Sequence, residues 1–327
     1  MNRIEPLHSL RGAAAIGVVF AHAYGATDLP FEFPRHAPQI GVDIFFAISG
    51  FVMMFAHREQ FGSKANAASF LRKRAIRIVP LYWLLTLLAV ALGIFAPFLF
   101  RNTAAFTPEW VIGSLLFIPV SSPDGFTVPV LGVGWTLNYE AIFYVIFAAG
   151  MLAPIRYGLP FVVAALIVIV PSYPMSVEFL FGMAVAWTVQ SRPEMLRAYR
   201  PALMLLVLCA IPATLFVPPE DGFVRAIAWG IPAAALVALI VTAKRAFGGS
   251  VLGDASYAIY LVQVFTLPAA FKLFRGLGLD NPFAAIAFAV ALTIAAGIVL
   301  WYAFEKPALH LLRSATGSRL SPAQTHL

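Results

Sequence analysis

An arginine and a histidine are the residues of the first apolar stretch that could do chemistry. Only Gly, Ala, Ile, Val and Phe separate Arg11 from His22. Eleven positions are about three helical turns, so the two side chains would share one face about 16 Å apart. Polar groups inside a bilayer are costly and usually face a cavity or a partner, which favours acid–base or acyl-carrier chemistry here. The alternative is an arginine that reaches lipid headgroups and a histidine at the opposite interface.

Two acids fall inside other apolar stretches. Asp43 lies near the start of the second stretch, where its carboxylate could pair with the His22 imidazole and orient it. Ser49 and Gly50 follow in the middle of that stretch and fit close helix packing. Glu140 lies one turn inside the fourth stretch, and an acid there is expensive unless it is paired or functional.

Further polar and aromatic residues could line a substrate site. Trp135 and Tyr139 flank the acid of the fourth stretch, although an interfacial aromatic belt would also explain them. Glu178 is a weaker case of an acid in an apolar environment. Tyr260 and Gln263 lie one helical turn apart, which favours packing plus a polar lining residue.

A dense group of cations opens the third apolar stretch. Arg74 and Arg77 are three positions apart and share a helix face, and Arg72 and Lys73 precede them directly. The group could simply anchor the cytoplasmic end of a span. Alternatively it forms a phosphate-binding face, because guanidinium groups suit phosphates and diphosphates.

These residues must be positioned by membrane helices. The chain has 327 residues, of which 61% are hydrophobic and only 11% charged, whereas soluble domains carry about 25% charged residues. We therefore expect an all-α integral membrane protein with one polytopic domain over residues 1–313 and a polar tail over 314–327. One cysteine and no metal-ligand spacing argue against a metal site.

The apolar pattern predicts about ten transmembrane helices, because a span needs about 20 apolar residues. They cover roughly residues 7–25, 40–57, 76–97, 134–152, 158–172, 175–190, 201–217, 223–243, 252–273 and 283–304. The segment 110–119 is too short to cross and is expected to be re-entrant or interfacial.

The distribution of charge predicts the orientation of these spans. Lys and Arg concentrate in the loops 58–77, 191–200 and 244–251 and in the tail, which puts both termini in the cytoplasm. Lys272 and Arg275 are the exceptions. The net charge of +7 then reflects topology and contact with anionic lipids, and no nucleic-acid partner is expected.

Five motifs in order resemble the bacterial membrane acyltransferase-3 family, which includes O-acetyltransferases of exopolysaccharide and O-antigen. The resemblance covers about residues 7–309 and rests on Arg11 with His22, Gly41–Phe51, Arg74-x-x-Arg77-Ile-x-Pro80, Trp135-Thr-Leu-x-x-Glu140 and Phe304-Glu305-Lys-Pro307. The short chain is most similar to the exopolysaccharide-type members.

The resemblance implies ten core spans in a bacterial inner membrane, an acyl-CoA donor such as acetyl-CoA on the cytoplasmic side, and a saccharide or lipid-linked glycan acceptor. By position, His22 and Arg11 are the catalytic pair, Arg74 and Arg77 bind the acyl donor, and Glu140 is a further site residue. Gln263 is a departure, because many relatives carry a histidine at that place.

The residues and the resemblance together predict a membrane O-acyltransferase without a metal. His22 would act as a general base or as a transient acyl carrier, with Asp43 or Glu140 orienting it. Two alternatives stay open: an acyltransferase for a small cytoplasmic metabolite, and a proton-coupled transporter, which would also carry intramembrane charges.

Overall fold

The computed structural model describes residues 5–27, 29, 36–96, 106–218, 222–243 and 250–315. Within these ranges the chain forms helices and no strands. The α-helices are α1 (Glu5–Gly25), α3 (Ile40–His57), α4 (Lys64–Phe95), α5 (Pro108–Leu115), α6 (Trp135–Met151), α7 (Ile155–Ile169), α8 (Ser176–Ser191), α9 (Pro193–Ala198), α10 (Arg200–Leu208), α11 (Ala210–Phe216), α12 (Gly222–Ala228), α13 (Gly230–Val241), α14 (Ser250–Asp254), α15 (Ser256–Gly276), α16 (Pro282–Leu300) and α17 (Lys306–Ala315). Short helical turns are η1 (Ala37–Gln39), η2 (Arg58–Gln60), η4 (Gly132–Gly134) and the π-helical turn η5 (Trp301–Glu305).

Membrane-spanning helices are part of this fold. In the described ranges, five helical stretches are long and apolar enough to cross a membrane: Ala37–Gln60, Lys64–Phe95, Gly222–Val241, Ser256–Gly276 and Pro282–Ser314. A helix or a run of consecutive helices lies at each of the ten predicted ranges, but the other helices are shorter or more polar. The helical membrane class is thus confirmed, and the number of ten spans stays a prediction.

The segment predicted to be too short to cross forms α5. Its eight residues reach about 12 Å, far less than the bilayer core of about 30 Å. The Thr107 side chain caps its first turn by accepting a hydrogen bond from the Trp110 amide. The Trp110 indole donates to the Val128 carbonyl over 2.7 Å, which ties α5 to the loop that follows it.

The third helix begins earlier than the apolar pattern predicts. Helix α4 starts at Lys64 rather than near residue 76, because Ser63 accepts from the Asn66 amide and caps a polar first turn. Its first three turns are not apolar, so hydropathy alone misses them. At the other end of the chain, α16 continues through η5 into α17, which ends at Ala315. Most of the predicted tail, 316–327, lies outside the described residues.

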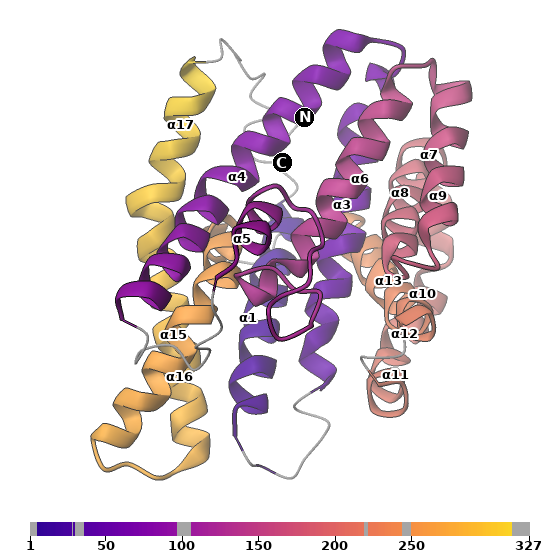
Figure 1. The fold of residues 1–327 in the computed structure, drawn as a ribbon. Helices are drawn as coiled ribbons and strands as arrows, with labels where there is room; N and C mark the ends of the chain where they lie inside the picture. The colour runs from indigo at the N-terminus through magenta and orange to yellow at the C-terminus, as the bar shows by residue number, and fades with distance from the viewer. Residues whose placement is uncertain are drawn as a thin grey trace.

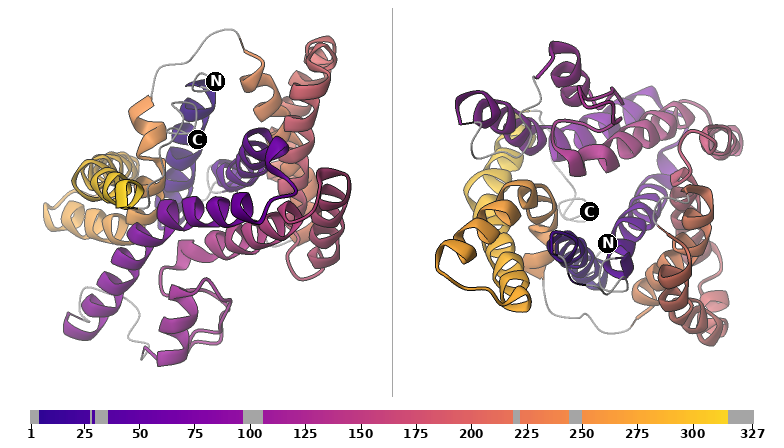
Figure 2. Two further views of the ribbon diagram at one scale, coloured as in Figure 1. Left: turned by 90° about the horizontal axis from the view of Figure 1, so that it is seen from above. Right: turned by 60° about the horizontal axis from the view of Figure 1, so that its bottom comes forward.

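Helices α1 and α3 lie between two groups of helices. Figure 1 and Figure 2 show α15, α16 and α17 on one side of this pair and α7 to α13 on the other. Helix α3 packs most closely on α8, since a Cβ atom at Gly50 would overlap the Phe179 carbonyl and one at Gly182 would overlap the Ala47 carbonyl. The predicted packing role of Gly50 is therefore confirmed.

Candidate active site

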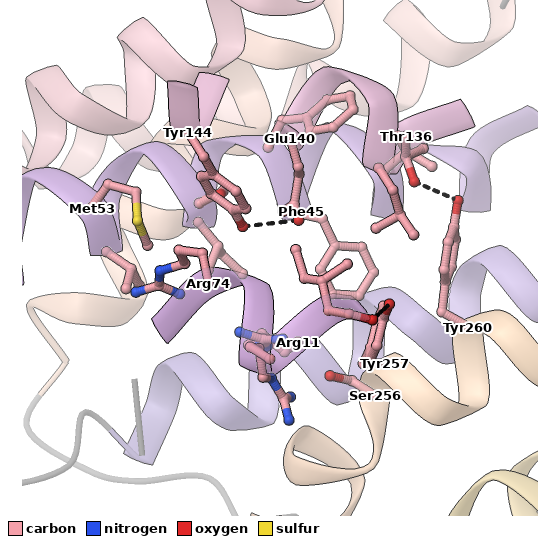
Figure 3. A pocket seen from close by; sticks show the side chains of 18 residues that line it. Arg11, Phe45, Met53, Arg74, Thr136, Glu140, Tyr144, Ser256, Tyr257 and Tyr260 are labelled. Carbon is pink, nitrogen blue, oxygen red and sulfur yellow. Dashed lines mark hydrogen bonds between the residues drawn. The ribbon is translucent and has the colours of Figure 1, made fainter. Parts of the chain in front are cut away.

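Five helices that are distant in sequence enclose one cavity. Helices α1, α3, α4, α6 and α15 all contribute lining residues (Figure 3). The cavity volume of about 80 Å³ leaves room for a few water molecules. Its polar lining side chains are Arg11, Ser49, Arg74, Arg77, Thr136, Glu140, Tyr144, Ser256, Tyr257 and Tyr260.

The charged lining of this cavity is mainly positive. It comprises three arginines, Arg11, Arg74 and Arg77, and one acid, Glu140. The Nε atoms of Arg11 and Arg74 are buried and lack a hydrogen-bond partner within the described chain. Unsatisfied guanidinium donors in a confined space favour an anion, because hydrogen bonds between charged groups are the strong ones.

The acid of the cavity is held by its neighbours. Glu140 accepts a hydrogen bond from the Tyr144 hydroxyl over 2.9 Å (Figure 3). Arg11 and Arg74 lie near enough to stabilise its charge, and the Arg74 guanidinium is 5.9 Å from the centre of the Tyr144 ring. Glu140 thus balances the arginines of the cavity. The prediction that it could orient His22 is not supported by these contacts.

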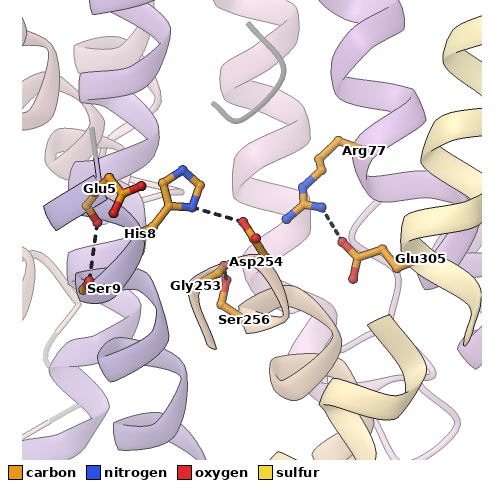
Figure 4. Close-up of polar contacts among 8 residues, drawn as sticks. All are labelled: Glu5, His8, Ser9, Arg77, Gly253, Asp254, Ser256 and Glu305. Carbon is orange, nitrogen blue, oxygen red and sulfur yellow. Dashed lines mark hydrogen bonds and ion pairs between the residues drawn. The ribbon is translucent and has the colours of Figure 1, made fainter. Parts of the chain in front are cut away.

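A second acid was missed as a site residue by reasoning from residue types. Glu305 lies in η5, is 2% exposed and forms an ion pair with Arg77 (Figure 4). The Tyr257 ring lies 5.9 Å from the same guanidinium, and its hydroxyl donates to the Ile78 carbonyl. The available signal was the Phe304-Glu305-Lys-Pro307 motif, which placed an acid at the end of the last apolar stretch.

More cations surround the arginines of the cavity. Arg72 is exposed and Lys73 is half-buried, and neither lines the cavity. Arg313 of α17 lies close enough to Arg74 and Arg77 for charge repulsion, a placement that the sequence analysis missed. Its position eight residues after Glu305, a little over two helical turns, was the only signal.

His22 lies further along α1, outside the residues that line the cavity. Its side chain is exposed, and its Nδ1 atom is 2.8 Å from Oε1 of Gln263. Gln263 is buried and follows Tyr260, a cavity residue, by one turn of α15. The predicted catalytic pair is therefore on one helix, but only Arg11 reaches the cavity.

The predicted pairing of Asp43 with His22 is wrong. The Asp43 carboxylate is fully buried and accepts a hydrogen bond of 3.0 Å from Arg225, which is 4% exposed. The Glu178 carboxyl, also fully buried, lies beside Asp43. The physical reason is packing, because α3 lies against α8 and α13 and this contact brings Arg225 of α12 to the acid. The cation in the apolar range 223–243 was a signal that the sequence analysis did not use.

The residues predicted to bind substrate do not line the cavity. The rings of Trp135 and Tyr139 meet edge to face with centroids 5.7 Å apart, and Tyr139 packs on Tyr173 with centroids 5.2 Å apart. Glu178 is enclosed near this aromatic group. Gln263 is separate from it and contacts His22.

Two other histidines of the described helices are buried, whereas His22 is exposed. His8 of α1 pairs with Asp254 over 3.4 Å (Figure 4), because α1 begins already at Glu5. The Nδ1 atom of His57 lies 3.1 Å from the Met53 carbonyl, and the ring packs on Phe70. Among the residues described, no three His, Cys, Asp or Glu side chains are grouped to hold a metal ion.

Comparison with known proteins gives one consistent class. The family model of the acyltransferase domain matches residues 6–302. The exopolysaccharide production protein ExoZ of Rhizobium meliloti (strain 1021) is 32% identical over 314 residues, which cover 86% of this chain and 92% of ExoZ. The acyltransferase MdmB of Streptomyces mycarofaciens is 27% identical, over 95% of this chain and 92% of its own length. No solved structure matches.

Proposed function

Because the chain belongs to the acyltransferase-3 family and is an acyltransferase, we propose that it transfers an acyl group, acetyl in the first instance, from acyl-CoA to a saccharide hydroxyl. The acceptor is an exopolysaccharide, an O-antigen or a lipid-linked glycan, as the name of the relative ExoZ suggests. The observation that carries the proposal is the cavity with three arginines and one acid in its lining.

The arginines would bind the acyl donor. The phosphates of acyl-CoA carry several negative charges, and Arg74 and Arg77 offer the planar donor pairs that bind such groups. Arg72, Lys73 and Arg313 add positive charge beside them. We assign the nucleotide end of the acyl donor to these cations and its thioester arm to the cavity that Arg11, Arg74 and Arg77 line.

The topology follows from the same cations. Ten spans with both termini in the cytoplasm put the α3–α4 junction, with its neighbouring basic residues, on the cytoplasmic side. The C-terminal end of α1, the start of α3 and the turn between α15 and α16 lie at the opposite end of the bundle (Figure 1). In this topology a single membrane domain lies in a bacterial inner membrane. Acyl-CoA binds at the arginines on the cytoplasmic side, and His22 lies in the outer half of the membrane.

The reaction assigns one step to each group. The acceptor oxygen attacks the thioester carbonyl carbon, the new C–O bond forms, and the C–S bond breaks. His22 takes the hydroxyl proton and returns it to the leaving CoA thiolate, or carries the acyl group between the two. The thioester must travel about 16 Å from Arg11 to His22 and must pass Tyr260, whose hydroxyl is 3.0 Å from Thr136.

The test is release of CoA thiol from acetyl-CoA by the purified protein in lipid. We expect release by wild type that is lost in His22→Ala, because the base or acyl carrier is gone. The Arg74→Gln/Arg77→Gln variant should instead raise the acyl-donor KM. His310→Ala, which removes an exposed histidine of α17, is the matched control and should keep wild-type turnover.

The outcomes separate the alternatives. Near-normal turnover in His22→Ala would contradict the assigned role of that residue. Solute flux without CoA release would support a transporter, and CoA release that depends on a small metabolite but not on saccharide would move the acceptor to the cytoplasm. If wild type neither binds nor consumes acyl-CoA, the proposed acyl donor is wrong.

A further inference from the structure

The contact between His22 and Gln263 joins two residues that are 241 positions apart. The Nδ1 atom of the imidazole lies 2.8 Å from Oε1 of the amide. His22 is exposed, whereas Gln263 is only 2% exposed. The exposed ring is therefore held by a buried side chain from the neighbouring helix α15.

A second hydrogen bond fixes the orientation of the amide. The Gln263 Nε2 atom donates to the Tyr260 backbone carbonyl over 2.6 Å. A carbonyl can only accept, so the NH₂ group must face Tyr260 and the amide oxygen must face His22. The reverse orientation would bring two oxygens together at Tyr260 and is excluded by their repulsion.

The orientation of the amide determines where the imidazole carries its proton. Oε1 can only accept a hydrogen bond, so Nδ1 must be the protonated ring nitrogen. In a neutral imidazole the other nitrogen, Nε2, then carries the free lone pair. An amide holds this tautomer without adding a charge, whereas a carboxylate in the same place would also stabilise the imidazolium.

We propose that Gln263 is a positioning residue that keeps the His22 proton on Nδ1 and leaves Nε2 as the nitrogen that acts on the substrate. The inference rests on the proposed function and deepens it, because a general base and an acyl carrier would both use Nε2. Gln263 of α15 thus orients the imidazole of His22 on α1.

The tautomer can be measured directly by nitrogen NMR of the full-length protein in lipid, labelled with ¹⁵N-histidine. Protonated and unprotonated ring nitrogens of neutral histidine resonate far apart, and couplings to the ring hydrogens tell Nδ1 from Nε2. The His22 signals are those lost in His22→Ala. We expect Nδ1–H in wild type, the same in Gln263→Glu, and a mixture in Gln263→Leu.

Turnover gives the second readout. We expect Gln263→Leu to lower kcat by about tenfold or more and to leave the acyl-donor KM within about twofold, because the acyl donor binds elsewhere. Gln263→Glu should retain most of kcat. Thr266→Val is the matched control, because it removes a hydrogen bond of 2.7 Å between α15 and Thr293 of α16 without touching His22.

Three results would overturn the inference. They are an Nε2–H tautomer in wild type, an unchanged tautomer in Gln263→Leu, and an unchanged kcat in that variant. If Gln263→Leu does not fold, Gln263→Met replaces it, and the wild-type spectrum alone still decides the tautomer. A wild type that releases no CoA would contradict the proposed function, whereas a wrong tautomer contradicts only the role of Gln263.

Discussion

Among its described residues, the protein buries two ionic clusters that differ in access and in balance of charge. The closed cluster is Asp43, Glu178 and Arg225, in which two acids enclose one cation and each member is 4% exposed or less. The open cluster is Arg11, Arg74, Arg77, Glu140 and Glu305, in which three cations outnumber two acids. Arg11, Arg74, Arg77 and Glu140 line the cavity, and no member of the closed cluster does.

The difference shows that burial of charge does not by itself mark a functional site. A buried ion pair is expensive, and its value is mostly to fix which helices meet. The closed cluster joins α3, α8 and α12 in this way. The open cluster has unsatisfied donors and a cavity beside them, so its charges are available to a ligand.

The largest effect is expected from breaking the closed cluster. Arg225→Met leaves the Asp43 carboxylate without its cation in a site that excludes water. We expect a loss of about 3–5 kcal/mol in the free energy of unfolding, measured as thermal unfolding of the purified protein in detergent.

A paired variant sharpens this test. Arg225→Met combined with Asp43→Asn removes both charges of the pair and should recover part of the lost stability. An unchanged melting temperature in the Arg225→Met single variant would show that the closed cluster contributes nothing to stability.

A smaller effect, of the opposite kind, is expected in the open cluster. Arg74→Gln removes one of three neighbouring cations, so stability should be unchanged or higher, while the acyl-donor KM rises about tenfold or more. Initial rates of CoA release over a range of acetyl-CoA concentrations measure this. If Arg74→Gln instead prevented folding, the open cluster would be needed for stability in the same way as the closed cluster.

The smallest effect is expected at the margin of the open cluster. Arg313→Gln should raise the acyl-donor KM about two- to fivefold at low salt and less at high salt, because half-buried cations are screened. Arg197→Gln is the control, since that exposed arginine pairs with Glu194 three positions away and does not line the cavity. A salt-independent change in KM would rule out an electrostatic role for Arg313.

The helices could be predicted from sequence because apolar length is a local property. Each predicted range contains helix, and the short segment before α6 is too short to span. The early start of α4 was missed because its first turns are polar and depend on the Ser63 cap. The number of spans is harder to read from the structure, because one predicted apolar range is divided at Cys209 into two short helices, α10 and α11.

The partners within the sites could not be predicted in the same way. Spacing along α1 relates Arg11 to His22, but it does not say which helix faces either residue. Asp43 meets Arg225 across 182 positions, and His22 meets Gln263 across 241. Both pairings depend on which helices pack together, and residue types alone left two carboxylates, Asp43 and Glu140, as possible partners for His22.

The turn η5 inserts a wider coil between two regular helices, with five residues in π-helical geometry. Such a turn accommodates about one extra residue relative to an α-helix. It therefore resets the rotational phase of everything that follows by about 100°, the angle of one helical position. The side chain of Arg313 faces α4 through this phase shift rather than through its own local sequence. Deleting one residue of the turn would leave the sequence of α17 unchanged. It would nevertheless rotate the whole helix, so that a different set of its side chains would face α4.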